Sequence, residues 1–228
     1  MTWIQTEQGR AFDLVTPDWR EIDFDEMANS LARQARFTGH IAGGPYSIAQ
    51  HLVIGADCVF SDTGSREAAA NFLLHDGEEY VIGDEATPKA QAEIAIARQL
   101  HGEEFARQFR AVKRELKRRV EVAVYLAANL TDYGCDLSFR DLVHEYDLRM
   151  LLTERKHLLG KPARPWALEI ERLQPLRLVG GLTVWPWPKA ADEFRERLRR
   201  YLPERFGAPS PRPKPAPRKT ARRILVEA

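Results

Sequence analysis

The chain has few cysteines and no long apolar segment. Its 228 residues include two cysteines, Cys58 and Cys135, which do not form a metal-type pair. We therefore expect a reduced, cytoplasmic setting and a packing role for both thiols. No stretch reaches the roughly 18 apolar residues of a transmembrane helix. Residues 1–5 also lack the basic-then-apolar pattern of a signal peptide. These absences predict that the protein has no membrane contact.

Charge is distributed unevenly along the chain, although the net charge is only +1. Residues 207–228 contain six Lys or Arg and five Pro against Glu227 alone, whereas the rest has 28 basic and 32 acidic residues. This composition predicts a disordered tail with polyproline tendency. Two interpretations of the tail remain open, a solubilising extension and a weak contact to the phosphate backbone of nucleic acid.

Length and composition indicate one domain with appendages. Hydrophobic residues make up 44% of the chain, which is enough for a core, and the sequence has no internal repeat. We place the main domain in residues 1–160, an extension that packs on it in 161–206, and the disordered tail in 207–228.

The pattern of apolar residues predicts a mainly α protein with a minor β part. Residues 3–6 and 11–15 flank Gln8-Gly9 and predict an N-terminal hairpin. The predicted helices cover residues 23–36, 47–60, 65–76, a segment from residue 87, and residues 103–130, 138–159 and 190–202. Their starts carry capping or first-turn signals at Asp23 with Glu26, Ser47, Ser65, Thr87 with Pro88, and Ser138. A second small hairpin is expected around Gly180-Gly181.

Histidine and aspartate occur in a spacing that predicts a metal site. His75-Asp76 ends an apolar helical run and is followed by Gly77. Adjacent side chains diverge by about 100° on a helix, so both face one site only near a helix end. His51 and Asp147 lie on two other predicted helices. Two imidazoles and two carboxylates suit one divalent ion, Mn, Co, Fe or Zn better than Mg. Taken singly, each residue could equally be an ordinary helix-end histidine or a surface acid.

The same residues resemble the H…HD…D signature of HD-domain metal phosphohydrolases. Around them, residues 46–51 (YSIAQH) and 73–80 (LLHDGEEY) are similar to the branch that contains bacterial 5′-deoxynucleotidases and phage-type HD hydrolases. Gly83-Asp84, residues 87–89 and residues 36–40 (RFTGH) also match that branch, and the likeness runs from about residue 9 to residue 160. The resemblance implies an HD helical bundle, the metal ligands His51, His75, Asp76 and Asp147, and a homodimer.

The resemblance also implies two catalytic carboxylates. Glu79 stands three residues after Asp76 and would act as a general acid/base on the attacking water or on the leaving oxygen. Asp84 would support the catalytic site, unless it only forms a turn. Glu78 is expected to be a solvated acid that points elsewhere.

Phosphate binding requires positive charge in addition to the metal. Arg36 is the best candidate, because a guanidinium grips phosphate oxygens in a fixed fork. Lys89 and Lys113 are further candidates, although all three could be surface residues. Phe37 either stacks on a base or fills the core. His40 either hydrogen-bonds the phosphate or attacking water, or caps a loop.

Three functions follow from these observations. The leading one is metal-dependent hydrolysis of a deoxynucleoside 5′-monophosphate to nucleoside and phosphate. An alternative is a deoxynucleoside triphosphate triphosphohydrolase, since both reactions use the same core. An alternative of another class is a non-catalytic nucleotide- or nucleic-acid-binding module. The short interval between His51 and His75, the Gly77-Glu78 pair and the segment after Gly160 depart from the compact deoxynucleotidases.

Overall fold

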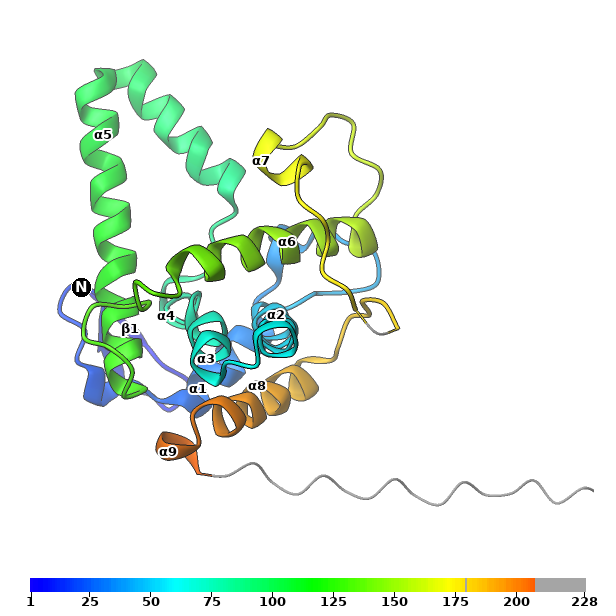
Figure 1. The fold of residues 1–228 in the computed structure, drawn as a ribbon. Helices are drawn as coiled ribbons and strands as arrows, with labels where there is room; N and C mark the ends of the chain where they lie inside the picture. Colours follow the sequence, from blue (N-terminus) through cyan, green and yellow to red (C-terminus); the bar gives the residue numbers. More distant parts are fainter. Residues whose placement is uncertain (179, 208–228) are drawn as a thin grey trace, which may run out of the picture.

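The computed structural model describes residues 1–178 and 180–207. It is mainly helical with a small two-stranded antiparallel sheet at the N-terminus (Figure 1), which confirms the predicted fold class. Apart from Gly207, the predicted disordered tail lies outside the described residues. In the part of the chain that is described, no helix is both long and apolar enough to cross a membrane.

The N-terminal hairpin forms where the sequence predicts it. Strands β1 (Trp3–Gln5) and β2 (Ala11–Asp13) pair antiparallel with Ile4 opposite Phe12. The turn closes through Gly9, whose positive φ of 81° suits glycine and whose N–H donates to the Thr6 carbonyl. Phe12 is buried and packs edge-on against Tyr80, with ring centroids 5.9 Å apart. The hairpin is thereby anchored to the segment that follows the His75-Asp76 pair.

Helix α1 (Phe24–Arg33) follows the short 3-10 helix η1 (Trp19–Glu21) and is capped by the Asp23 carboxylate, as predicted. It ends three residues earlier than the predicted boundary at Arg36. The chain leaves helical geometry at Gln34, and the Arg36 N–H donates instead to the Tyr46 carbonyl. The 3-10 turn η2 (Arg36–Gly39) follows, with Phe37 and Thr38 at positive φ. This break turns the arginine-aromatic segment away from the axis of α1.

Helices α2 (Ile48–Thr63) and α3 (Arg66–Leu74) form the centre of the bundle. Ser47 and Ser65 cap them by accepting N–H groups of the first turn, which confirms both predicted starts. Gly55 lets the helices approach closely, since a Cβ there would lie 2.1 Å from the Phe72 ring. The short helix α4 (Glu79–Ile82) follows α3 and packs against α1.

Helix α5 (Thr87–Ala127) is interrupted at Gly102, whose φ of 87° breaks helical geometry. The helices predicted to start at residues 87 and 103 are therefore its two halves. They form a V that projects from the body of the molecule (Figure 1). Between the halves lies a small apolar cluster of Ile94, Ala97 and Ala106, with Phe109 packed against it.

Helix α6 (Arg140–Leu158) packs against α2 and α3 from one side. The prediction that Ser138 caps it is wrong, because the Ser138 N–H and hydroxyl both donate to the Asp136 carboxylate. The helix begins at Arg140 without a side-chain cap. Its later start does not alter the position of Asp147 near its middle.

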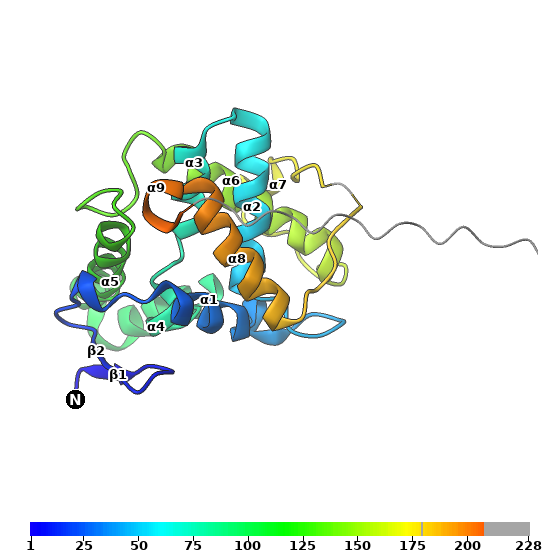
Figure 2. The same cartoon turned by 90° about the horizontal axis from the view of Figure 1, so that it is seen from below.

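The C-terminal segment completes the bundle. Helix α8 (Trp187–Tyr201) packs against α1, α2 and α3 (Figure 2), and α9 (Pro203–Phe206) follows it. Phe194 is fully buried, and Arg197 pairs with Asp57 of α2 at 2.6 Å. Between α6 and α8 the described residues contain the short helix α7 (Leu168–Glu171) and no strand, so the hairpin expected around Gly180-Gly181 is not found there.

Candidate metal centre

His51 lies in the first turn of α2 and is completely buried. Its Nδ1 is 2.7 Å from Oε1 of Glu154, a carboxylate that can only accept a hydrogen bond when ionised. This contact places the proton on Nδ1. The lone pair of Nε2 is therefore free to bind a metal ion. Nε2 lies 3.4 Å from Oδ1 of Asp147 on α6.

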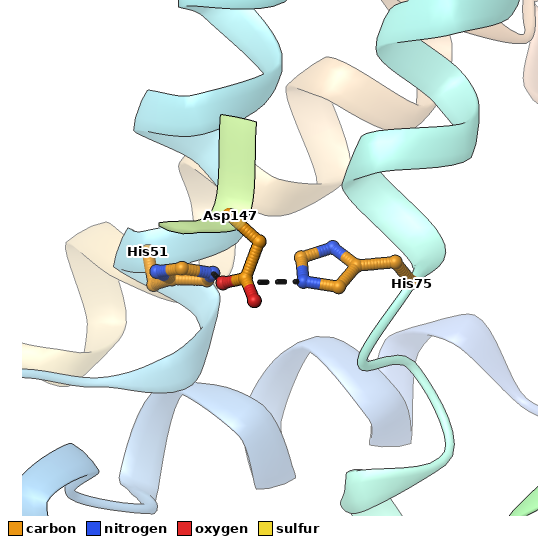
Figure 3. Close-up of side chains that lie close together, drawn as sticks. All are labelled: His51, His75 and Asp147. Carbon is orange, nitrogen blue, oxygen red and sulfur yellow. Dashed lines mark ion pairs between the residues drawn. The ribbon is translucent and has the colours of Figure 1, made fainter. Parts of the chain in front are cut away.

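His75 is positioned by the end of α3. It is the residue that follows the last helical residue, and its Nδ1 lies 2.7 Å from the Phe72 carbonyl oxygen. Because a carbonyl only accepts, Nδ1 carries the proton and Nε2 is free. Nε2 lies 3.7 Å from Oδ1 of Asp147, which stands between the two imidazoles (Figure 3).

Asp76 joins the cluster because the chain turns immediately after the helix. Its Oδ2 is 3.3 Å from Nε2 of His75, and the Gly77 N–H closes the turn on the Leu74 carbonyl at 2.9 Å. A Cβ at residue 77 would lie 3.0 Å from that carbonyl oxygen and 3.1 Å from a Val124 methyl group. Glycine therefore lets both His75 and Asp76 face the same point, as the sequence predicts for a helix end.

The chemistry of this cluster suits a divalent ion. The donor atoms of His51, His75 and Asp147 lie within 4.8 Å of one another, and Asp76 adjoins His75. Both imidazole Nε2 atoms are buried and make no hydrogen bond of good geometry with the described residues. Buried polar atoms are rarely left without a partner. The two imidazole nitrogens and Oδ1 of Asp147, which lies 3.4 and 3.7 Å from them, form a group that could bind one cation. Oδ2 of Asp76 lies 3.3 Å from the His75 nitrogen but belongs to a second group of acids with Glu78 and Glu79.

Electrostatics in the cluster also favour positive charge. Burial opposes a charged His75, but the carboxylates of Asp76 and Asp147 outweigh it and raise the pKa of His75 well above its usual value. Burial likewise works against an ionised Asp147, yet the adjacent His51 and His75 hold its pKa far below the ordinary range. The site therefore stabilises a cation between ionised carboxylates.

A buried ion pair that sequence reasoning missed supports the ligands. Glu154 has no exposed side-chain surface, and besides His51 it contacts Nε of Arg36 at 3.3 Å. Its position seven residues after Asp147 places both on one face of α6, which is the signal that could have identified it. Arg36 also lies 3.8 Å from Oδ2 of Asp76. Burial disfavours its charge, but Glu154, Asp147 and Asp76 raise its pKa further.

A second group of acids adjoins Asp76 on the other side. Glu79 is 7% exposed, and burial with the neighbouring Asp76 raises its pKa to about 9. The prediction that Glu78 is solvated is wrong, since it is fully buried and burial raises its pKa to about 7. Lys117, not singled out from the sequence, approaches from α5 with Nζ 2.8 Å from Glu78 and 3.3 Å from Asp76.

Three other predicted residues lie around the cluster with different surroundings. Asp84 is half-buried, and burial raises its pKa while Arg36 opposes the rise. Phe37 packs against the core with its ring centroid 5.8 Å from the Arg36 guanidinium, which supports the core-filling interpretation. His40 is exposed at the end of η2, where its N–H donates to the Phe37 carbonyl. This is a backbone contact, so both interpretations of the His40 side chain stay open.

Lys89 and Lys113 are not brought to the metal ligands. Each ammonium group pairs with the carboxylates of Glu85 and Glu93 instead. Lys113 and Lys117 lie one turn apart on α5, but it is Lys117 that contacts Asp76. The sequence singled out Lys113 on this helix but not Lys117, which contacts Asp76.

Comparison with known proteins adds little to this geometry. No family model matches the chain. An uncharacterized protein of Rhodobacter capsulatus is 36% identical over 90 residues, which cover 38% of this chain and 45% of that relative. The matched part spans less than half of either protein. The HD resemblance therefore rests on the sequence motifs alone.

Proposed function

We propose that the protein is a metal-dependent phosphohydrolase of the HD type, with one divalent ion held by His51, His75, Asp76 and Asp147. The observation that carries this proposal is the convergence of His51, His75 and Asp147 beside Asp76, with the two buried imidazole nitrogens left free. An ion bound there would act as a Lewis acid that orients a phosphate and activates water.

The surrounding residues supply the remaining requirements of phosphoester hydrolysis. The Arg36 guanidinium, held beside Asp76 by Glu154, carries a fixed positive charge for a phosphate oxygen. Burial and the neighbouring Asp76 raise the pKa of Glu79, which favours its protonated form. It is therefore suited to give its proton to the leaving oxygen as the bond to phosphorus breaks. The leading reaction is the conversion of a deoxynucleoside 5′-monophosphate into nucleoside and phosphate.

We also propose a cytoplasmic homodimer. Both cysteines are free, which agrees with a reducing compartment. Exposed apolar side chains on α5 would support self-association, namely Ile96, Leu100, Phe105, Val112 and Leu116. Light scattering on the purified chain tests the dimer, and a monomer at micromolar concentration would reject it.

The experiment for the activity is a panel of nucleoside mono-, di- and triphosphates with added Mn, Co, Fe, Zn or Mg. Asp147→Ala is expected to abolish phosphate release, because it removes the carboxylate between both imidazoles. Asp141→Ala, an exposed acid near the start of the same helix, is the matched control and should retain activity. Release of triphosphate alone would replace the leading reaction, and nucleotide binding without any turnover would favour a non-catalytic module.

A further inference from the structure

A cavity of about 450 Å³ lies between the two halves of α5. Cations dominate its ionisable lining, with one carboxylate among them: Arg98, Arg110, Lys113, Arg114, Lys117 and Glu85. A concave surface lined by one sign of charge concentrates ligands of the opposite sign. The cavity therefore suits an anionic ligand.

The cations differ in how far nearby acids neutralise them. Lys113 is bound by Glu85 and Glu93, and Arg98 pairs with Glu103. Arg110 and Arg114 form no ion pair with residues 1–178 or 180–207, although both line the cavity. Charge that the fold leaves uncompensated in a cavity is available for a ligand.

The cavity reaches the metal centre through Lys117. Its Nζ lies 3.3 Å from Asp76 and 3.9 Å from Glu79, and its side chain also lines the cavity. Lys117 is therefore shared by the cavity and the metal centre. Arg114 and Arg110 follow it at intervals of three and four residues on the same face of α5. From Lys117 to Arg110 the helix rises about 10 Å, or two turns. The positive charge thus forms a row that leads outward from the centre.

We propose that this cavity binds the phosphodiester backbone of a single-stranded oligonucleotide whose terminal phosphate reacts at the metal centre. The inference rests on the proposed phosphohydrolase function and names its substrate class. Water adds to the terminal phosphorus and the bond from phosphorus to the 5′ oxygen breaks. One proton of the water passes through Glu79 to that oxygen, and the other stays on the released phosphate. The products are inorganic phosphate and an oligonucleotide with a 5′ hydroxyl.

The distribution of charge favours a strand over a smaller nucleotide. A monophosphate has its only phosphate at the centre and leaves Arg110 and Arg114 without a role. A triphosphate has its phosphates joined directly and reaches only the inner end of the row. A positively charged groove that follows the backbone is how proteins bind single strands without sequence preference.

The test compares Arg110→Gln/Arg114→Gln with Arg107→Gln/Arg118→Gln in the full chain. The control pair lies on the same helix, removes the same charge and is not part of the cavity lining. Arg107 pairs with Glu104, and Arg118 pairs with Glu115. Fluorescence anisotropy with a 5′-phosphorylated, 3′-fluorescein hexathymidylate in EDTA measures binding across a salt series. Circular dichroism confirms that both variants fold.

The plot of log K against log salt has a negative slope. Loss of two phosphate contacts should reduce the magnitude of this slope by about 1.4. With equal affinities at 1 M salt, this change in slope corresponds at 0.1 M salt to affinity about 25-fold weaker than that of the unmodified protein. The control should bind within about threefold of the unmodified protein. Equal weakening of both variants, or no binding by the unmodified protein, would overturn the inference.

Phosphate release distinguishes this failure from that of the proposed function. With manganese, the Arg110→Gln/Arg114→Gln variant should show a raised KM for the hexanucleotide and an unchanged KM for thymidine monophosphate. Turnover of mono- or triphosphates without the oligonucleotide would overturn the inference and leave the phosphohydrolase in place. Salt-dependent binding without turnover of any substrate would instead reject the phosphohydrolase.

Discussion

The substitution Glu154→Gln tests whether the buried carboxylate behind His51 is needed by the metal centre. The side chain has no exposed surface and contacts Nδ1 of His51 at 2.7 Å and Nε of Arg36 at 3.3 Å. Glutamine keeps the shape and one acceptor oxygen but removes the charge. Breaking a buried ion pair outright costs about 3–5 kcal/mol. Because the amide retains part of the hydrogen bonding, we expect about 2–3 kcal/mol of lost stability.

The same change should weaken metal binding about 10–100-fold, since a carboxylate hydrogen-bonded to a ligating imidazole fixes its orientation and raises its basicity. Calorimetric titration with Zn or Mn measures the affinity, and urea unfolding measures the stability. The control is Glu145→Gln on the same helix, an exposed residue that pairs with Arg149 at 3.4 Å and should change stability by less than about 1 kcal/mol. Metal affinity within twofold of the unmodified protein, together with unchanged stability, would refute the reasoning.

Two further predictions concern packing and pH. Gly55→Ala should destabilise the fold by about 1–3 kcal/mol, because the added Cβ meets the buried Phe72 ring, whereas Gly160→Ala, with open space, should change little. Urea unfolding measures these changes. If the Gly55→Ala/Phe72→Leu double variant lost as much unfolding free energy as the two single variants added together, the proposed clash would be contradicted. Burial and Asp62 raise the pKa of the Cys58 thiol to about 11. At pH 8 alkylation of Cys58 should therefore be about 100-fold slower than that of a free cysteine, and its rate should rise steeply above pH 10. Peptide mass spectrometry measures the rate, and a rate independent of pH in that range would contradict the raised pKa.

The sequence predicted the elements that depend on local signals. Ser47 and Ser65 cap their helices as expected, because an N-cap depends on contacts within one turn. Ser138 failed as a cap because another local acceptor, Asp136, binds its hydroxyl. The end of α1 also escaped prediction, because the bridge that pairs Ala35 with Ser47 joins segments brought together only by the fold.

In the candidate site, too, the residues marked by local sequence were predicted and those that depend on long-range contacts were missed. The ligand motif could be read because His75-Asp76 and its flanking residues are contiguous. Glu154 and Lys117 were missed because their contacts with His51 and Asp76 span 103 and 41 residues of sequence. Glu78 was assigned to solvent from its position beside Glu79, yet the packing around α4 buries both acids. Of these residues, only Glu154 has a local signal, its position seven residues after Asp147 on one face of α6.

The central claim is that one cation is shared by ligands from three helical segments. The most direct measurement is the metal content per chain after dialysis against Mn or Zn, in the unmodified protein, in His75→Asn and in His157→Asn. His157 is an exposed histidine in the last turn of α6 and serves as the control. The account predicts one ion per chain in the unmodified protein and the control, and none in His75→Asn. No bound ion in the unmodified protein, or equal content in all three, would contradict it.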